Sequence, residues 1–269
     1  MTRDTERPLP FLDAARRVFD LALEGMIWSR RSLLMAVLLG LPALFALLYR
    51  VVTASKGSPP ISADDLYGQI VALYSIRNVV PLAALFYATS LVADEVDGKT
   101  ITYLLTRPIP RGSILAGKFV AYLATTFALS LPATVLTFFI LATAPGSDGI
   151  GPRVGDLLRD VGVVALTLLT YGALFTLLGV VLRRPVIPGI LFLFVWEVLA
   201  NLPGYAPRLT LTAYLRSLVH HRIADEGIFG MAVEVLPAPL CLAVLSLSTL
   251  AFLGAALWIF STREYVLES

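Results

Sequence analysis

The feature that most constrains this chain is a series of long apolar stretches separated by short polar segments. A helix needs about 20 apolar residues to cross a bilayer core of roughly 30 Å, where water cannot satisfy the backbone. The sequence predicts six such spans, over residues 33–52, 68–93, 114–142, 161–182, 186–202 and 240–260. The predicted fold class is therefore an all-α integral membrane protein with six transmembrane helices.

Composition excludes the main soluble classes. Hydrophobic residues make up 57% of the chain and charged residues 15%, whereas soluble domains run nearer half apolar and about a quarter charged. A single cysteine, Cys241, leaves no intrachain disulfide or cysteine-rich metal site. The formal net charge of +2 is too small to indicate a nucleic-acid partner, so none is expected.

The lysines and arginines predict the orientation, since they favour the cytoplasmic side. With the N-terminus inside, 13 of the 21 lie on that side, and the pairs Arg30-Arg31 and Arg183-Arg184 lack acidic neighbours. Both termini are therefore predicted to be cytoplasmic, with residues 261–269 as a tail. Residues 33–260 would form the six-span membrane domain, and the expected location is a bacterial or archaeal cytoplasmic (inner) membrane.

Residues 1–32 do not look like a signal peptide, because charges recur throughout them. A helical stripe of apolar residues faces a charged stripe here, which is typical of an amphipathic helix lying in the membrane interface. A cytosolic helix packed on a partner protein is the alternative. The apolar stripe consists of Phe11, Ala15, Val18, Ala22 and Met26.

The segment 94–113, between the second and third predicted spans, is polar at its start and then amphipathic. Thr100 could cap a short helix that ends before Pro108 and presents Tyr103, Leu104 and Leu105 to a partner. A plain amphipathic connector is the alternative. Gly98-Lys99-Thr100 is not a phosphate-binding loop, because Ala93 stands where that motif needs glycine.

This segment resembles the permease subunits of ABC-2 type transporters. In that family a Glu, a Gly-Lys-Thr or Gly-Thr, paired leucines, a Pro and an Arg recur between the second and third spans, before a basic residue entering the third. The matching residues here are Glu95, Gly98 to Thr100, Leu104-Leu105, Pro108, Arg111 and Lys118. The interfacial N-terminal helix, the six spans and a long segment before the last span add to the resemblance.

The resemblance implies a permease that exports a substrate using ATP hydrolysed by a separate subunit. Two copies of an ABC ATP-binding subunit would dock on the short helix of segment 94–113, which would act as the coupling helix. A second permease copy would complete a homodimer or a related heterodimer. ATP and Mg would bind the ATPase, so no cofactor and no enzymatic activity are expected on this chain. The implied coupling residues are Asp94, Glu95, Asp97, Gly98, Thr100, Tyr103, Leu104, Leu105, Pro108 and Arg111.

Two ionisable residues lie well inside predicted spans, where charge is costly and often functional. Arg77 and Glu197 fall at similar depth, so a pair between them is predicted as a lining or gate of the translocation path. A purely structural pair, or groups reaching the outer surface, is the alternative. Asn201 could line a vestibule, although a helix cap is the simpler role for it.

The outer segment 203–239 is too long for a turn and too polar to span. An apolar stripe from Leu211 to Val219 predicts a surface helix that could cover an exit site or bind an external partner. His220-His221 is expected to be solvated rather than metal-binding, because adjacent histidines do not face one way on a helix. Two rival functions, a membrane-embedded enzyme and a non-transporting anchor, remain open.

Overall fold

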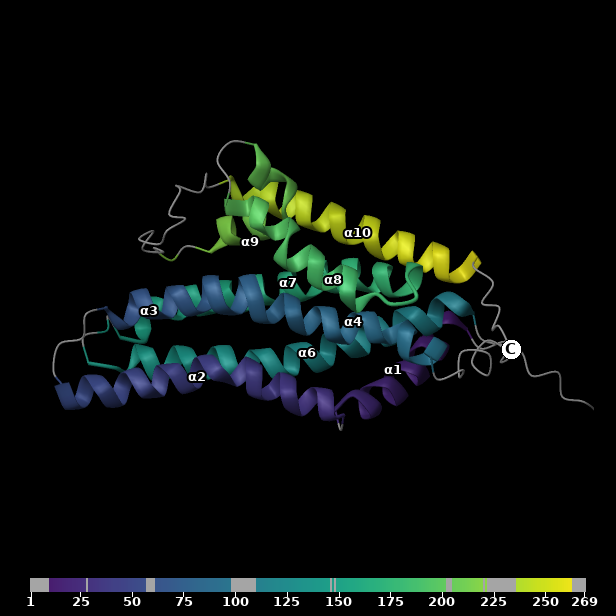
Figure 1. Ribbon diagram of the computed structural model, residues 1–269. Helices are drawn as coiled ribbons and strands as arrows, with labels where there is room; N and C mark the ends of the chain where they lie inside the picture. The colour runs from purple at the N-terminus through teal and green to yellow at the C-terminus, as the bar shows by residue number, and fades with distance from the viewer. Residues whose placement is uncertain are drawn as a thin grey trace, which may run out of the picture.

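The computed structural model describes residues 10–27, 29–56, 61–97, 110–145, 147, 149–201, 205–219, 221 and 236–262. All regular structure in these ranges is helical. Figure 1 shows the long helices lying roughly side by side, with α10 along one edge and α1 at an angle to α2. Five helices in the described ranges are long and apolar enough to cross a membrane.

The N-terminal helix α1 spans Phe11–Ile27 and α2 spans Arg30–Lys56. α1 packs mainly against α6, and Ala14 and Val18 of α1 are both buried. Leu12 and Leu21 lie exposed on the rest of its surface. The predicted helix is therefore present, while its position in the membrane interface stays a prediction.

The second candidate span is one continuous rod of changing geometry, from α3 (Ala63–Gln69) through η1 (Ile70–Val79) to α4 (Val80–Asp97). η1 is a π-helix of 10 residues, far longer than the single-turn bulges in which this geometry usually occurs. Arg77 and Asn78 lie in η1, and the Asn78 side chain donates to the Leu73 carbonyl five residues earlier. Arg77 and Asn78 thus lie where the helix type changes within this candidate span.

The longest helices are α6 (Arg111–Ala142) and α7 (Val154–Val181), with a 3-10 turn, η2 (Gly151–Arg153), before α7. They approach closely where Gly172 faces Tyr122, since a Cβ on Gly172 would stand 2.3 Å from the Tyr122 ring. The Tyr122 hydroxyl donates to the Leu168 carbonyl at 2.8 Å. The absence of a side chain at Gly172 therefore sets how closely these two helices pack.

The predicted fifth span is wrong as a continuous helix. α8 covers only Val186–Phe194, about 13 Å at 1.5 Å per residue, and the 3-10 helix η3 (Trp196–Asn201) follows it. The break turns the Glu197 side chain onto protein donors, which a carboxylate needs in an apolar environment. Two short elements come next, η4 (Ala206–Leu209) and α9 (Leu211–Leu218), and α10 (Ala238–Thr262) is the last candidate span.

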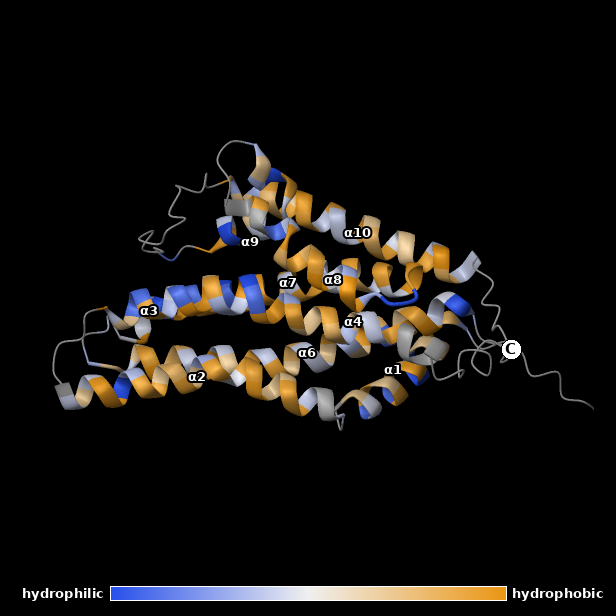
Figure 2. Cartoon of the chain, viewed as in Figure 1, coloured by the Kyte–Doolittle hydropathy of each residue, from blue (hydrophilic) through white to orange (hydrophobic). Residues whose placement is uncertain are grey.

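The end of α4 and the start of α6 lie at the same end of the bundle. Figure 1 shows the end of α4, the start of α6 and the end of α10 together at one end of the bundle, with α3 at the opposite end. In Figure 2, α2, α6, α8 and α10 are predominantly hydrophobic, whereas α3 carries hydrophilic residues. This arrangement brings the two helices that flank residues 98–109 to one end. The orientation relative to a membrane stays a prediction.

Candidate functional site

The residues that the sequence singles out for coupling fall at the junction of α4 and α6. Asp94, Glu95 and Asp97 form the end of α4, and Arg111 is the first residue of α6. The remaining predicted coupling residues lie outside the described residues: Gly98, Thr100, Tyr103, Leu104, Leu105 and Pro108. The structure therefore fixes the two helices that carry this segment and leaves its docking role a prediction.

Specific contacts connect the helices at this end. Lys118 of α6 donates its ammonium group to the Leu91 carbonyl of α4 at 2.9 Å. Tyr87 of α4 donates to the Ser32 hydroxyl at 2.6 Å, and Ser32 donates to the Met26 carbonyl. Hydrogen bonds thus join α6 to α4, and α4 to the corner between α1 and α2.

Close packing also joins α1 to α6. Gly117 of α6 lies so close to α1 that a Cβ there would stand 2.4 Å from the Ala15 carbonyl oxygen. Contact between backbones at this distance requires glycine. Contacts therefore join the end of α4 and the first half of α6 to α1 and α2.

A buried hydrogen-bond network surrounds Glu197, far from this junction along the chain. Tyr171 of α7 donates to one carboxylate oxygen at 2.7 Å, and the Thr212 N–H donates to the other at 3.3 Å. The hydroxyls of Tyr171 and Thr212 lie 2.9 Å apart. Because Thr212 is in the first turn of α9, Glu197 caps that helix together with Thr210, which accepts from Ala213 N–H.

The structure gives Glu197 partners other than the predicted Arg77. Within the part of the chain that the structure describes, the hydrogen bonds of the Glu197 carboxylate go to Tyr171 and Thr212. Arg77 lies half-buried in the π-helix η1. Asn201 ends the 3-10 helix η3. Glu197 has these partners because the helix breaks after α8, and the break turns the Glu197 side chain toward α7 and α9.

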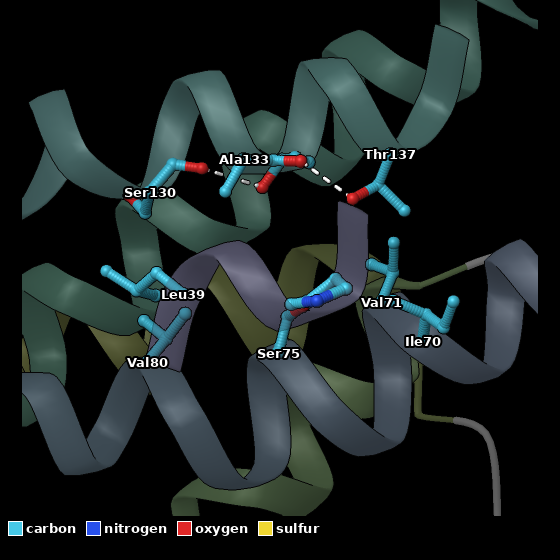
Figure 3. A pocket seen from close by; sticks show the side chains of 10 residues that line it. Leu39, Ile70, Val71, Ser75, Val80, Ser130, Ala133 and Thr137 are labelled. Carbon is cyan, nitrogen blue, oxygen red and sulfur yellow. Dashed lines mark hydrogen bonds between the residues drawn. The ribbon is translucent and has the colours of Figure 1, made fainter. Parts of the chain in front are cut away.

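A small cavity lies between α2, the π-helix and α6 (Figure 3). Hydroxyl groups line one side of it: Thr134 and Thr137 of α6 donate to carbonyls of their own helix at 3.0 and 2.7 Å. Ser75 of the π-helix faces them across the cavity. Its volume of about 10 Å³ is enough for one water molecule at most. The cavity is thus a hydroxyl-lined point of contact between helices, and it is too small for a transported molecule in this conformation.

A larger groove, of about 600 Å³, runs between the middle of α6 and the middle of α7. Its walls are entirely apolar, with Leu123 and Phe127 on α6 and Leu166 and Leu169 on α7. Gly162 widens it, since a Cβ there would meet nothing within 4 Å. A groove of this composition suits hydrocarbon chains rather than polar groups.

A second buried polar cluster joins three elements at the α3 end of the bundle. Asp160 of α7 accepts from the Tyr67 hydroxyl of α3 at 2.9 Å, and the same oxygen lies 2.8 Å from Nε2 of His221. Arg153 forms an ion pair with Asp64 and lies over the Tyr67 ring. The prediction that the histidine pair is solvated is therefore wrong for His221, whose side chain is 9% exposed.

Replacing Asp160 by asparagine is expected to lower the free energy of unfolding by about 1–2 kcal/mol. Asparagine keeps one oxygen acceptor but removes the charge that strengthens both hydrogen bonds. The measurement is the unfolding midpoint of the purified chain in detergent. D20N, at an exposed position on α1, is the control, and equal midpoints for the two variants would contradict the prediction.

Sequence reasoning missed the partners of both buried acids. Tyr171 lies 12 residues before Arg183, and Glu197 lies 14 residues after it. Similar distances from a shared turn place two residues at similar depth, so this pairing could have been found. No comparable signal points to His221 or Thr212, because neither lies in a predicted span and neither therefore has a predicted depth.

Comparison with known proteins gives one family assignment. The family model described as "ABC-2 family transporter protein" matches residues 26–265. A comparison with curated proteins found no match. The matched range begins near the end of α1 and extends past the end of α10, so it includes all five candidate spans.

Proposed function

The chain belongs to the ABC-2 family of transporter proteins, and from this premise we propose that it is the permease subunit of an ATP-driven exporter. It moves a substrate across the cytoplasmic membrane, and a separate ATP-binding subunit hydrolyses the ATP. Two copies of that subunit dock on residues 94–113 of a permease dimer. Mg and ATP bind the partner, and this chain supplies the path.

One observation supports this proposal beyond the family itself. The helices that flank residues 98–109, α4 and α6, are joined to each other by Lys118 and to the α1–α2 corner by Tyr87. A motion received between them would therefore move four helices together. A permease needs this property to convert closure of an ATPase into a change in the membrane, whereas a passive anchor does not.

The α6–α7 groove and the Glu197 network give the proposal two further elements. The groove offers apolar walls at the middle of two candidate spans. The network attaches α9 to α7 through a buried carboxylate. In the proposed transporter, Glu197 holds α9 in place at the exit of the translocation path. Release of α9 would accompany opening of that path.

Changing Leu104 and Leu105 to aspartate is expected to abolish binding of the ATPase. Two charges in a docking helix would have to be desolvated in the ATPase groove, at a cost that such an interface does not recover. The measurement is co-purification of a Walker-motif ATPase with the tagged chain, extracted from its native membranes in mild detergent.

The conservative pair L104I and L105I is the control and should retain the ATPase. An ATPase bound equally by the aspartate variant would place the docking surface elsewhere. Absence of any ATPase from the intact preparation would remove the proposed mechanism and favour a membrane-embedded enzyme or an anchor.

A further inference from the structure

A proline lies inside α2, and a residue of the neighbouring π-helix supplies the hydrogen bond that this proline cannot make. Pro42 has no N–H, so it cannot donate to the Leu38 carbonyl four residues earlier. The Tyr74 hydroxyl of η1 donates to that carbonyl at 3.0 Å. The Tyr74 ring also packs edge-on against Phe45 of α2, with the ring centroids 6.3 Å apart. A side chain of one helix thus completes the backbone hydrogen bonding of another.

The helix that provides Tyr74 is itself irregular. η1 keeps the π geometry over 10 residues, and π segments are rare and occur frequently at functional sites. Its backbone also bonds to a side chain, since Asn78 donates to the Leu73 carbonyl. Two adjacent residues of η1, Leu73 and Tyr74, therefore take part in hydrogen bonds that a regular α-helix does not contain.

A third helix, α6, is interrupted at the same level. Pro132 lies inside α6 between Ser130 and Ala133. These two residues line the small cavity that Pro42 and Ser75 also line (Figure 3). The cavity therefore lies where irregular segments of three helices meet, and its volume of about 10 Å³ leaves room for one water molecule beside Pro42.

We propose that α2 bends at Pro42 and that the hydrogen bond from Tyr74 to the Leu38 carbonyl controls this hinge. With the bond formed, η1 holds the two halves of α2 in one orientation. With the bond released, a water molecule satisfies the carbonyl, and α2 bends away from the proline ring.

The position of the donor is what makes this kink a hinge. A donor within α2 would move with that helix and fix the kink permanently, whereas Tyr74 belongs to a separate helix and can leave with it. A change in η1 would therefore change the bend of α2. This inference rests on the contacts of α2 and does not depend on an ATPase or on a substrate.

A distance measured within α2 tests the proposal. Spin labels are attached to cysteines that replace Leu33 and Val51, which are both more than half exposed. They lie five helical turns apart, about 27 Å, and both lie on the face opposite to Pro42, so bending away from the proline brings them together. The measurement is double electron–electron resonance on the purified chain in detergent. Cys241 is changed to alanine, and unlabelled chain is added so that distances within one chain are measured.

In Y74F, the ratio of shorter to longer distances should rise about fivefold over the parent, as for the loss of one hydrogen bond. P42A gives the Leu38 carbonyl a backbone donor again, so only the longer distance should remain. P42A/Y74F should match P42A, because Tyr74 is then no longer needed. Y49F is the matched control and should match the parent, since Tyr49 of α2 donates to the Ile61 carbonyl, outside the helix, at 2.8 Å.

Three results would overturn the proposal. Equal distance distributions in Y74F and the parent would show that Tyr74 does not control the hinge. The same rise in P42A/Y74F as in Y74F would show that the bend does not arise from Pro42. An equal rise in Y49F would show a general loosening of α2 and no specific effect of Tyr74.

Discussion

Replacing Gly117 by alanine is expected to detach α1 from α6. The new Cβ would stand 2.4 Å from the Ala15 carbonyl oxygen and 3.1 Å from Cβ of Val18. Because the first contact is with backbone, no change of rotamer can relieve it. Overpacking of this kind typically costs about 1–3 kcal/mol of stability. Here the whole cost would fall on the interface between α1 and α6.

The matched control is G112A in the same helix, where the nearest atoms would lie 3.7 Å away at ordinary contact distance. Both substitutions replace glycine by alanine in α6, so the difference between the two variants reports mainly the clash at Gly117. The measurements are the unfolding midpoint in detergent and tryptic cleavage at Arg16 and Arg17 of α1. Equal midpoints and equal protection in the two variants would show that α1 does not pack on α6 as described.

Replacing Glu197 by alanine is expected to lower the free energy of unfolding by about 3 kcal/mol. The substitution leaves the buried Tyr171 hydroxyl and Thr212 N–H without their acceptor, and each unsatisfied group costs about 1–3 kcal/mol. Tyr171 can still contact the Thr212 hydroxyl, so the total stays below the sum. E24A, at an exposed acid on α1, is the control and should change stability by less than about 0.5 kcal/mol.

A double-mutant cycle of Y171F and E197A measures the coupling energy between the Tyr171 hydroxyl and the Glu197 carboxylate, because each change removes one partner of the hydrogen bond. Residues in direct contact show coupling energies of about 0.5–3 kcal/mol, and a buried hydrogen bond to a carboxylate belongs in the upper part of that range. Additive effects of the two changes would contradict the described hydrogen bond.

The variant E197Q tests the proposed role of Glu197 at the exit. Glutamine preserves the shape of the side chain and one oxygen acceptor, while it removes the charge. ATP hydrolysis by the associated subunit should persist, and transport should fall. Unchanged hydrolysis together with unchanged transport would leave Glu197 as a helix cap alone.

The sequence by itself predicted the long helices well. α2, α6 and α10 contain the predicted spans 33–52, 114–142 and 240–260, and the family assignment agrees with the resemblance carried by residues 94–118. The amphipathic pattern before the first span corresponds to α1. These features could be predicted because a helix in lipid must satisfy its own backbone, so length and hydropathy suffice to identify it.

Only the tertiary structure decided where the polar groups go. Arg77 and Glu197 share a depth in the sequence, yet Glu197 bonds to Tyr171 and Thr212, and His221 inserts beside Asp160. Close approaches at Gly117 and Gly172 are likewise invisible in hydropathy. Hydropathy fixes the depth of a residue but not its rotation about the helix or its neighbours. A buried polar group is stabilised only by partners at hydrogen-bond distance, and packing in three dimensions selects those partners.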